Sequence, residues 1–258
     1  MLGKLIKYEL KATARTLMPL YIALLAFALI NRLFMGSSNN MNSDLLGGIP
    51  MMLSIFAYAF TMAAVFIITF FVIVQRFYKN LLGDEGYLMN TLPVKAWMNI
   101  SSKLVTSIIW SIVSGIVAIL SIIIMAFSQD ILTNLFSGIN NLTSYLSQGY
   151  FGVAVELILY GFVSMISSTL MLYLSISIGH LFNKRRIFAS FGSFIVINMI
   201  ISAIKGTMQG SVYQGSVYIG NNSGIIPKTN GLLVFDLILA IVFFVACNYI
   251  IKNKLNLE

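Results

Sequence analysis

The chain contains six apolar stretches, each long enough to form a helix that crosses a lipid bilayer. A membrane-spanning helix needs about 20 consecutive apolar residues, because the hydrocarbon core is about 30 Å thick. The chain is 59% hydrophobic and only 9% charged, whereas soluble domains usually carry about 25% charged residues. We therefore predict an all-α integral membrane protein with six transmembrane helices.

The limits of the apolar stretches set the limits of the predicted spans. The spans cover residues 17–34, 51–74, 104–127, 151–182, 187–204 and 231–251, within a single transmembrane domain of residues 1–258. The segment 128–150 is expected to be a loop with a short amphipathic turn. That turn involves Ile131, Leu132, Leu135 and Phe136.

Lysine and arginine are unevenly distributed between the two predicted sides of the membrane. Thirteen of them lie before the first span, in the segment 75–103, in the turn around Asn183 or after the last span. Only Arg32, Lys205 and Lys228 lie on the other side. Cytoplasmic segments carry an excess of basic residues, so both termini are expected in the cytoplasm and the chain in the plasma membrane. This pattern also accounts for the net charge of +8, and we expect membrane lipid, and no nucleic acid, as a partner.

The first sixteen residues read MLGKLIKYELKATART, with apolar residues at helical spacing and four basic residues among them. This pattern is typical of a helix that lies in the membrane interface. A basic tail that anchors the first span fits the same residues. At the other end of the chain, the Gly-, Ser- and Asn-rich segment 205–230 repeats QGSVY at 209–213 and 214–218. We expect a loop or re-entrant segment there, either a substrate gate or a local duplication in a tolerant loop.

Side chains that could support catalysis are few. The only histidine is His180, and no H-E-x-x-H pattern occurs, so neither a catalytic residue nor a metal site is predicted. The serines of the fourth span are better suited to close helix packing than to nucleophilic chemistry. No G-x-x-x-x-G-K-[ST] motif occurs, so an ATP-driven function would require a second subunit.

Two acidic residues, Glu156 and Asp236, lie inside predicted spans. Charged side chains there are costly and often functional. Both are close to the predicted external ends of their spans, where they could reach water or pair with Arg32, Lys205 or Lys228. A structural ion pair and a position along a substrate path both remain open.

The segment 75–103, QRFYKNLLGDEGYLMNTLPVKAWMNISSK, separates the second and third spans. A polar segment of this length must project into water. Gly83 suits the end of the second helix, and Asp84 and Glu85 suit the start of a new one. Tyr87 and Leu88 give this new helix an apolar face, which favours a docking element for a soluble partner over a plain connector.

The same segment resembles the permease subunits of the ABC type-2 exporter family, in which a similar E-G-Y-L-x-x-T-L-P-V sequence follows the second span. The residues that carry the resemblance are Glu85, Gly86, Tyr87, Leu88, Thr91, Leu92, Pro93 and Val94. The N-terminal K-x-E-L-K stretch at 7–11 and the six-span layout are also similar. The QGSVY duplication departs from the family pattern.

The resemblance implies a type V exporter, built from two permease chains, identical or homologous, and two ABC ATPase subunits. ATP and Mg would be bound by the ATPase, so this chain would hold no cofactor and would not itself be an enzyme. Residues 1–16 would form the connecting helix, 75–103 would carry the coupling helix, and 205–230 would be external. The residues expected to dock the ATPase are Asp84, Glu85, Tyr87, Leu88 and Leu92.

The predicted substrate is amphipathic or hydrophobic, such as a peptide, toxin, drug or lipid, because the spans offer few buried charges for a hydrophilic solute. Peptide export and antimicrobial resistance are the uses toward which similar permeases lean. Two other functions compete with export: an ATPase-independent secondary transporter and, with less support, an intramembrane enzyme.

Overall fold

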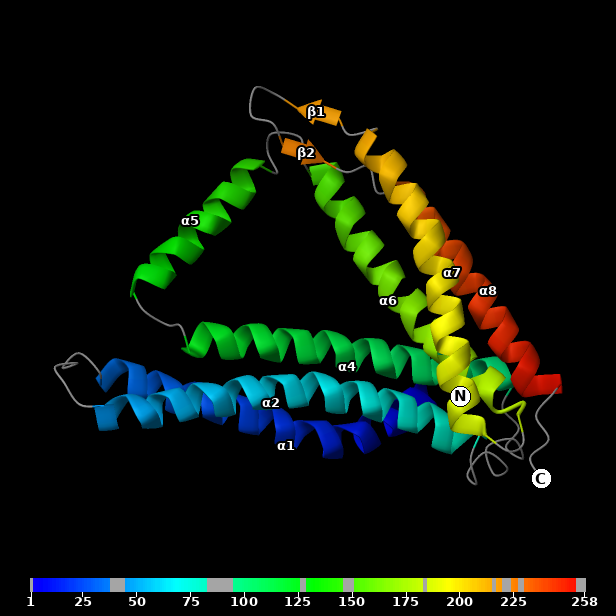
Figure 1. Cartoon of the computed structure of the whole chain (residues 1–258), viewed down its shortest axis with the longest axis horizontal. Coiled ribbons are helices and arrows are strands. Elements are labelled where there is room, and N and C mark those ends of the chain that lie inside the picture. Colours follow the sequence, from blue (N-terminus) through cyan, green and yellow to red (C-terminus); the bar gives the residue numbers. More distant parts are fainter. Residues whose placement is uncertain are drawn as a thin grey trace. The chain divides into compact units, whose positions relative to one another are not determined.

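Helices make up nearly the whole of the computed structural model (Figure 1). It describes residues 2–37, 45–82, 95–125, 129–145, 151–182, 185–214, 217–219, 224–226 and 230–253. Six of the described helices are long and apolar enough to cross a membrane: α1 (Leu2–Ser37), α2 (Leu45–Phe77), α4 (Ala96–Met125), α6 (Phe151–Gly179), α7 (Arg186–Gln214) and α8 (Asn230–Asn253). The chain is therefore a helical, multi-pass membrane protein, as the sequence predicts.

These helices form two compact units. Unit 1 comprises Met1–Gln75 and Val105–Ser144, and unit 2 comprises Arg76–Leu104 and Tyr145–Glu258. Figure 1 shows α1, α2 and α4 side by side in the first unit, and α6, α7 and α8 side by side in the second. One boundary lies inside α2 and the other inside α4, so the end of α2 and the beginning of α4 belong to the same unit as α6, α7 and α8.

Unit 1 has an apolar core crossed by hydrogen bonds between helices. The core residues are Leu17, Tyr21, Leu24, Ala28, Tyr58, Val65, Val72 and Trp110. The hydroxyls of Tyr21 and Ser114 lie 2.7 Å apart, and those of Ser114 and Thr69 lie 3.1 Å apart. A third pair joins Tyr58 to Ser121 at 2.9 Å. Hydroxyls buried in a membrane bundle are satisfied across helices in this way.

The N-terminal segment forms no separate helix, because residues 2–37 make one continuous helix, α1. No break in the helix marks the boundary expected at residue 17, between an interfacial helix and the first span. Pro19 lies in the interior of α1. Proline removes one backbone hydrogen bond, which membrane helices tolerate because neighbouring groups satisfy the freed carbonyl.

Several helices extend beyond the apolar stretches. α2 begins at Leu45 and is followed by a π-helix, η2 (Tyr78–Leu82), while α4 begins at Ala96 and not at 104. The last two spans behave differently from each other: α8 matches its predicted limits within two residues, whereas α7 continues to Gln214, ten residues past its predicted end. The hydropathy of the sequence shows which residues lie in the hydrocarbon layer. A helix can continue beyond that layer, because its backbone N–H and C=O groups stay hydrogen-bonded to each other there as well.

The two copies of QGSVY take different structures. The first copy, 209–213, belongs to α7, so the loop expected from residue 205 is wrong over 205–214. Glycine costs a helix only about 1 kcal/mol, and no proline interrupts these residues. Val217 and Tyr218 of the second copy lie in β1 (Val217–Ile219), which pairs antiparallel with β2 (Gly224–Ile226).

The segment between α4 and α6 contains a longer helix than expected. α5 (Gln129–Tyr145) has 17 residues and is strongly amphipathic, in place of one short turn. The helical spacing of apolar residues noted at 131–136 continues in the sequence to residue 142, which explains the extension. Phe136 is exposed on this helix.

In unit 2, α6 packs against both α7 and α8. The backbones of α6 and α7 are in close contact at Gly179, where an added Cβ would lie 2.5 Å from the backbone nitrogen of Ser190. The Ser193 hydroxyl donates to the carbonyl of Ser175 across the two helices at 3.0 Å. α6 ends at Gly179, three residues before its predicted limit, in a turn that the Phe182 N–H closes onto the Gly179 carbonyl.

Candidate functional site

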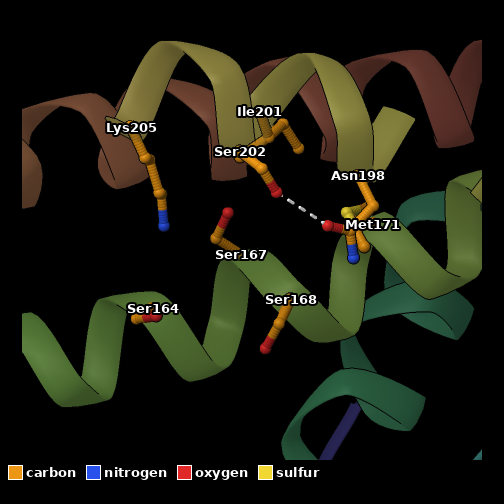
Figure 2. A pocket seen from close by; sticks show the side chains of 8 residues that line it. All are labelled: Ser164, Ser167, Ser168, Met171, Asn198, Ile201, Ser202 and Lys205. Atoms are coloured by element: carbon orange, nitrogen blue, oxygen red, sulfur yellow. Dashed lines mark hydrogen bonds between the residues drawn. The ribbon is translucent and has the colours of Figure 1, made fainter. Parts of the chain in front are cut away.

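A cavity of about 230 Å³, lined mainly by polar residues, lies between α6 and α7 (Figure 2). We call it the α6–α7 groove, and it is lined by Ser164, Ser167, Ser168 and Met171 from α6 and by Asn198, Ile201, Ser202 and Lys205 from α7. Each set has the spacing i, i+3, i+4 and i+7, which places its members on one face of a helix. The groove is therefore made by two matching helix faces.

Hydroxyls on α6 divide into two groups by their hydrogen bonds. Ser168, Thr169 and Ser175 donate to a carbonyl three or four residues earlier on their own helix, the usual arrangement for such residues in helices. Within the described part of the chain, the hydroxyls of Ser164 and Ser167 have no hydrogen-bond partner, although Ser167 is only 6% exposed. These two hydroxyls are available to a molecule in the groove.

An ion pair lies at one end of the groove. The Lys205 Nζ is 2.7 Å from Asp236 Oδ1 and donates a hydrogen bond to Oδ2 at 2.9 Å. Asp236, on α8, is 0% exposed, and Lys205 is 24% exposed. A charge inside a span needs such a partner. Because an ammonium has three donors and the Lys205 side chain points toward α6 (Figure 2), the pair also presents an N–H to the groove.

Amide and hydroxyl groups of α7 complete the polar lining. The Ser202 hydroxyl lies 3.0 Å from Asn198 Oδ1, a contact drawn in Figure 2. This contact leaves the Asn198 Nδ2 group, a donor of two hydrogen bonds, without a partner among the described residues. Asn198 and Ser202 are both exposed, so the groove opens at their side.

The structure separates the two acidic residues that the sequence places inside spans. Asp236 forms one of the ion pairs considered from the sequence, with Lys205, at the edge of the groove. Glu156 is half-buried on α6 and is not among the groove residues. Of the two acids, only Asp236 is in a position to influence a molecule bound there.

The five residues expected to dock an ATPase lie outside the described residues. They are Asp84, Glu85, Tyr87, Leu88 and Leu92, all within 83–94. The structure does describe the residues that lead into this segment. We call Phe77–Leu82, which comprises the end of α2 and η2, the stem.

The stem is fixed to α6 by aromatic contacts. The rings of Phe77 and Tyr173 stack with centroids 4.0 Å apart and an interplanar angle of 6°, and both side chains are buried. The next residue, Tyr78, has its ring 5.5 Å from that of His180. Aromatic pairs contribute about 0.5–1.5 kcal/mol beyond the burial of their surface. π-helical turns such as η2 often occur at functional sites, and here the turn follows the anchored Phe77.

His180 lies in the turn after α6, where burial lowers its pKa and the nearby positive charge of Arg186 lowers it further. Its imidazole is therefore neutral at pH 7. This neutral ring packs beside Tyr78 of the stem. Within the described part of the chain, no group of three His, Cys, Asp or Glu side chains could hold a metal ion.

We predict that Phe77→Ala destabilises the protein by about 3 kcal/mol, because it removes a fully buried ring from a stacked pair. Thermal unfolding in mild detergent would show a lowered Tm. Phe66→Ala is the matched control, since Phe66 lies on the same helix and is 48% exposed. Equal Tm values for the two variants would show that the stem is not held by Tyr173.

The sequence analysis predicted neither the groove nor the contact between Phe77 and Tyr173. The sequence did contain a signal for the groove, because Asn198, Ser202 and Lys205 recur on one helical face in and just after an apolar span. The Phe77–Tyr173 contact joins residues far apart in the sequence and has no local signal. Comparison of the chain with models of protein families, with curated proteins and with solved structures gives no match. The groove and the stem are thus the features from which a function can be argued.

Proposed function

We propose that this chain is the membrane subunit of an ATP-driven exporter, which moves an amphipathic or hydrophobic substrate out of the cell. The substrate classes that fit are peptides, toxins, drugs and lipids, with peptide export and antimicrobial resistance as corresponding roles. The observation that carries the proposal is the stacking of Phe77 on Tyr173. It fixes the stem of the docking segment to α6, the helix that contributes half of the residues lining the groove.

This contact gives the docking segment a mechanical role. A separate ATPase that closes on ATP and Mg would pull on residues 83–94, and the stem would pass that motion to α6 through Phe77 and Tyr173. A displacement of α6 relative to α7 would change the groove that they line. ATP binding would thereby shift the membrane subunit between two conformations, which is how a ligand biases a bistable element.

The proposed complex has two ATPase copies and a second permease chain, identical or homologous to this one. It would lie in the plasma membrane with both termini of this chain in the cytoplasm, since the thirteen basic residues counted above lie on that side. The ATPase then docks on the side where residues 83–94 lie. Asp84 and Glu85 would meet basic groups of the ATPase, and Tyr87, Leu88 and Leu92 would provide apolar anchors.

A pull-down from mild detergent tests this proposal. We expect the wild-type chain to retain a P-loop ATPase in stoichiometric amount, and the double variant Tyr87→Ala/Leu88→Ala to lose nearly all of it while inserting into the membrane normally. Phe136→Ala on α5, predicted on the opposite side of the membrane, is the matched control and should retain the ATPase.

Two results would contradict the proposal. If the double variant keeps its ATPase, residues 87 and 88 are not the docking surface. If the wild-type chain purifies alone under conditions that preserve complexes, the segment 75–103 is a connector and a secondary transporter becomes the better interpretation.

A further inference from the structure

We propose that the α6–α7 groove binds the uncharged, hydrogen-bonding head of an amphipathic molecule, such as an amide or a hydroxyl-bearing group, while the apolar remainder stays in the bilayer. The identification of this molecule with the transported substrate rests on the proposed function. The binding itself does not, because it follows from the size, opening, charge and hydrogen-bonding groups of the groove.

The size of the groove selects part of a molecule. Its volume of about 230 Å³ is below the range of about 300–1,000 Å³ typical of sites that enclose a drug-sized ligand. A headgroup fits this space, and a complete amphipathic molecule does not. The remainder of the ligand must therefore lie outside the groove.

The opening of the groove shows where that remainder lies. Ser168, Asn198 and Ser202 are exposed, whereas Ser167 is buried at the base. Large apolar side chains on the same stretch of α7, Ile195, Met199 and Ile200, are also exposed. The groove, with its hydroxyl and amide groups, therefore opens beside a surface suited to acyl chains. Polar groups that face hydrocarbon without partners are costly, so a polar headgroup stabilises this arrangement.

The charge of the groove disfavours ionic headgroups. Lys205 is the only charged residue among those that line the groove, and Asp236 neutralises it at 2.7 Å. An added anion would leave two negative groups to share one ammonium, and an added cation would be repelled by Lys205. Unpaired charge is expensive at such a buried position, so a neutral headgroup is preferred.

The hydrogen-bonding groups of the groove match a headgroup that both donates and accepts. The Ser164 and Ser167 hydroxyls have no partner within the described residues and can do either. The Asn198 Nδ2 and the Lys205 ammonium are donors. Amides and vicinal hydroxyls offer the complementary pair of a donor and an acceptor.

Photo-crosslinking of the full chain in lipid nanodiscs tests this inference. Three probes share one acyl chain with a diazirine near the headgroup: a monoacylglycerol, the corresponding fatty acid, and an alkyltrimethylammonium. At pH 8.5 the second is anionic and the third cationic. We expect the monoacylglycerol to label peptides that contain residues 164–171 or 198–205 at least about fivefold more than either ionic probe, the ratio expected from about one hydrogen bond.

Variants then assign the labelling to the groove. Ser167→Ala/Ser202→Ala removes two groove hydroxyls and should reduce labelling by the monoacylglycerol about fivefold or more. Thr207→Val is the matched control, because Thr207 is an exposed hydroxyl of α7 that does not line the groove. Equal labelling by the ionic probes, labelling unaffected by the double variant, or labelling confined to other peptides would each overturn the inference.

The headgroup could belong to a resident lipid or to a molecule in transit. Analysis of the lipids that purify with the wild type and with the double variant distinguishes these two sources. A lipid recovered in stoichiometric amount from the wild type, and lost from the double variant, indicates a resident lipid. Exchange of the occupant for the monoacylglycerol during purification indicates a molecule in transit. No ATP is used, so these results stand whether or not the pull-down supports the exporter, and failure of the two proposals can be told apart.

Discussion

Asp236→Asn is expected to destabilise the protein by about 3–5 kcal/mol, the cost of breaking a buried ion pair by removing one partner. The variant leaves the Lys205 ammonium uncompensated within a membrane helix, at a site where it contacts both oxygens of this carboxylate in the wild type. The expected observation is a large fall in Tm in detergent, together with a smaller monodisperse peak in size-exclusion chromatography.

A double replacement separates the ion pair from the general effect of changing Asp236. Lys205→Met/Asp236→Leu removes both charges and keeps similar volumes, and such replacements are often neutral or stabilising. We expect it to recover most of the lost Tm, with a clear interaction energy in the double-mutant cycle. A double variant as unstable as Asp236→Asn would mean that packing at position 236, and not the charge pair, determines stability.

Gly179→Ala is expected to force α6 and α7 apart where their backbones meet. The added methyl group would lie 2.5 Å from the Ser190 nitrogen and 2.6 Å from its Cα, and backbone atoms cannot move aside as a flexible side chain can. Overpacking usually costs about 1–3 kcal/mol and sometimes more, so thermal unfolding should show a clear decrease in Tm.

Two other glycines on the same helices provide matched controls for Gly179. An added Cβ at Gly161 on α6 or at Gly192 on α7 would meet nothing within 4 Å. Alanine favours helix over glycine by about 1 kcal/mol, so Gly161→Ala and Gly192→Ala should be neutral or slightly stabilising. If Gly179→Ala behaved like them, the close approach of α6 to Ser190 would be wrong.

The sequence predicts the number and type of the membrane helices well, because the thickness of the bilayer imposes a length on every apolar stretch. It predicts their ends less well. α1 includes the basic residues before the first apolar stretch, and α7 includes the first QGSVY copy, since a helix has no need to stop where its hydrophobic residues do. Pairing of distant helices, as in Phe77 with Tyr173, leaves no periodic pattern to read.

Of the candidate site, only the ion pair between Asp236 and Lys205 could be predicted from the sequence. Asp236 in an apolar stretch requires a partner, and Lys205 is one of few available cations. The serines of α6 look equivalent in the sequence, yet Ser175 is bonded to its own helix while Ser167 is open to the groove. Only the spatial arrangement separates these roles. The docking residues between 83 and 94 stay a prediction from the sequence.

The position of the stem has a consequence for how the protein is made. Tyr173 follows Phe77 by 96 residues in the sequence, so the surface that covers the Phe77 ring is translated long after the ring itself. At about 5–20 residues per second, synthesis of this interval takes roughly 5–20 s. Throughout that time the stem of a nascent chain lacks its stacking partner on α6. A truncated chain that stops before α6 would lack the Tyr173 ring on which Phe77 stacks.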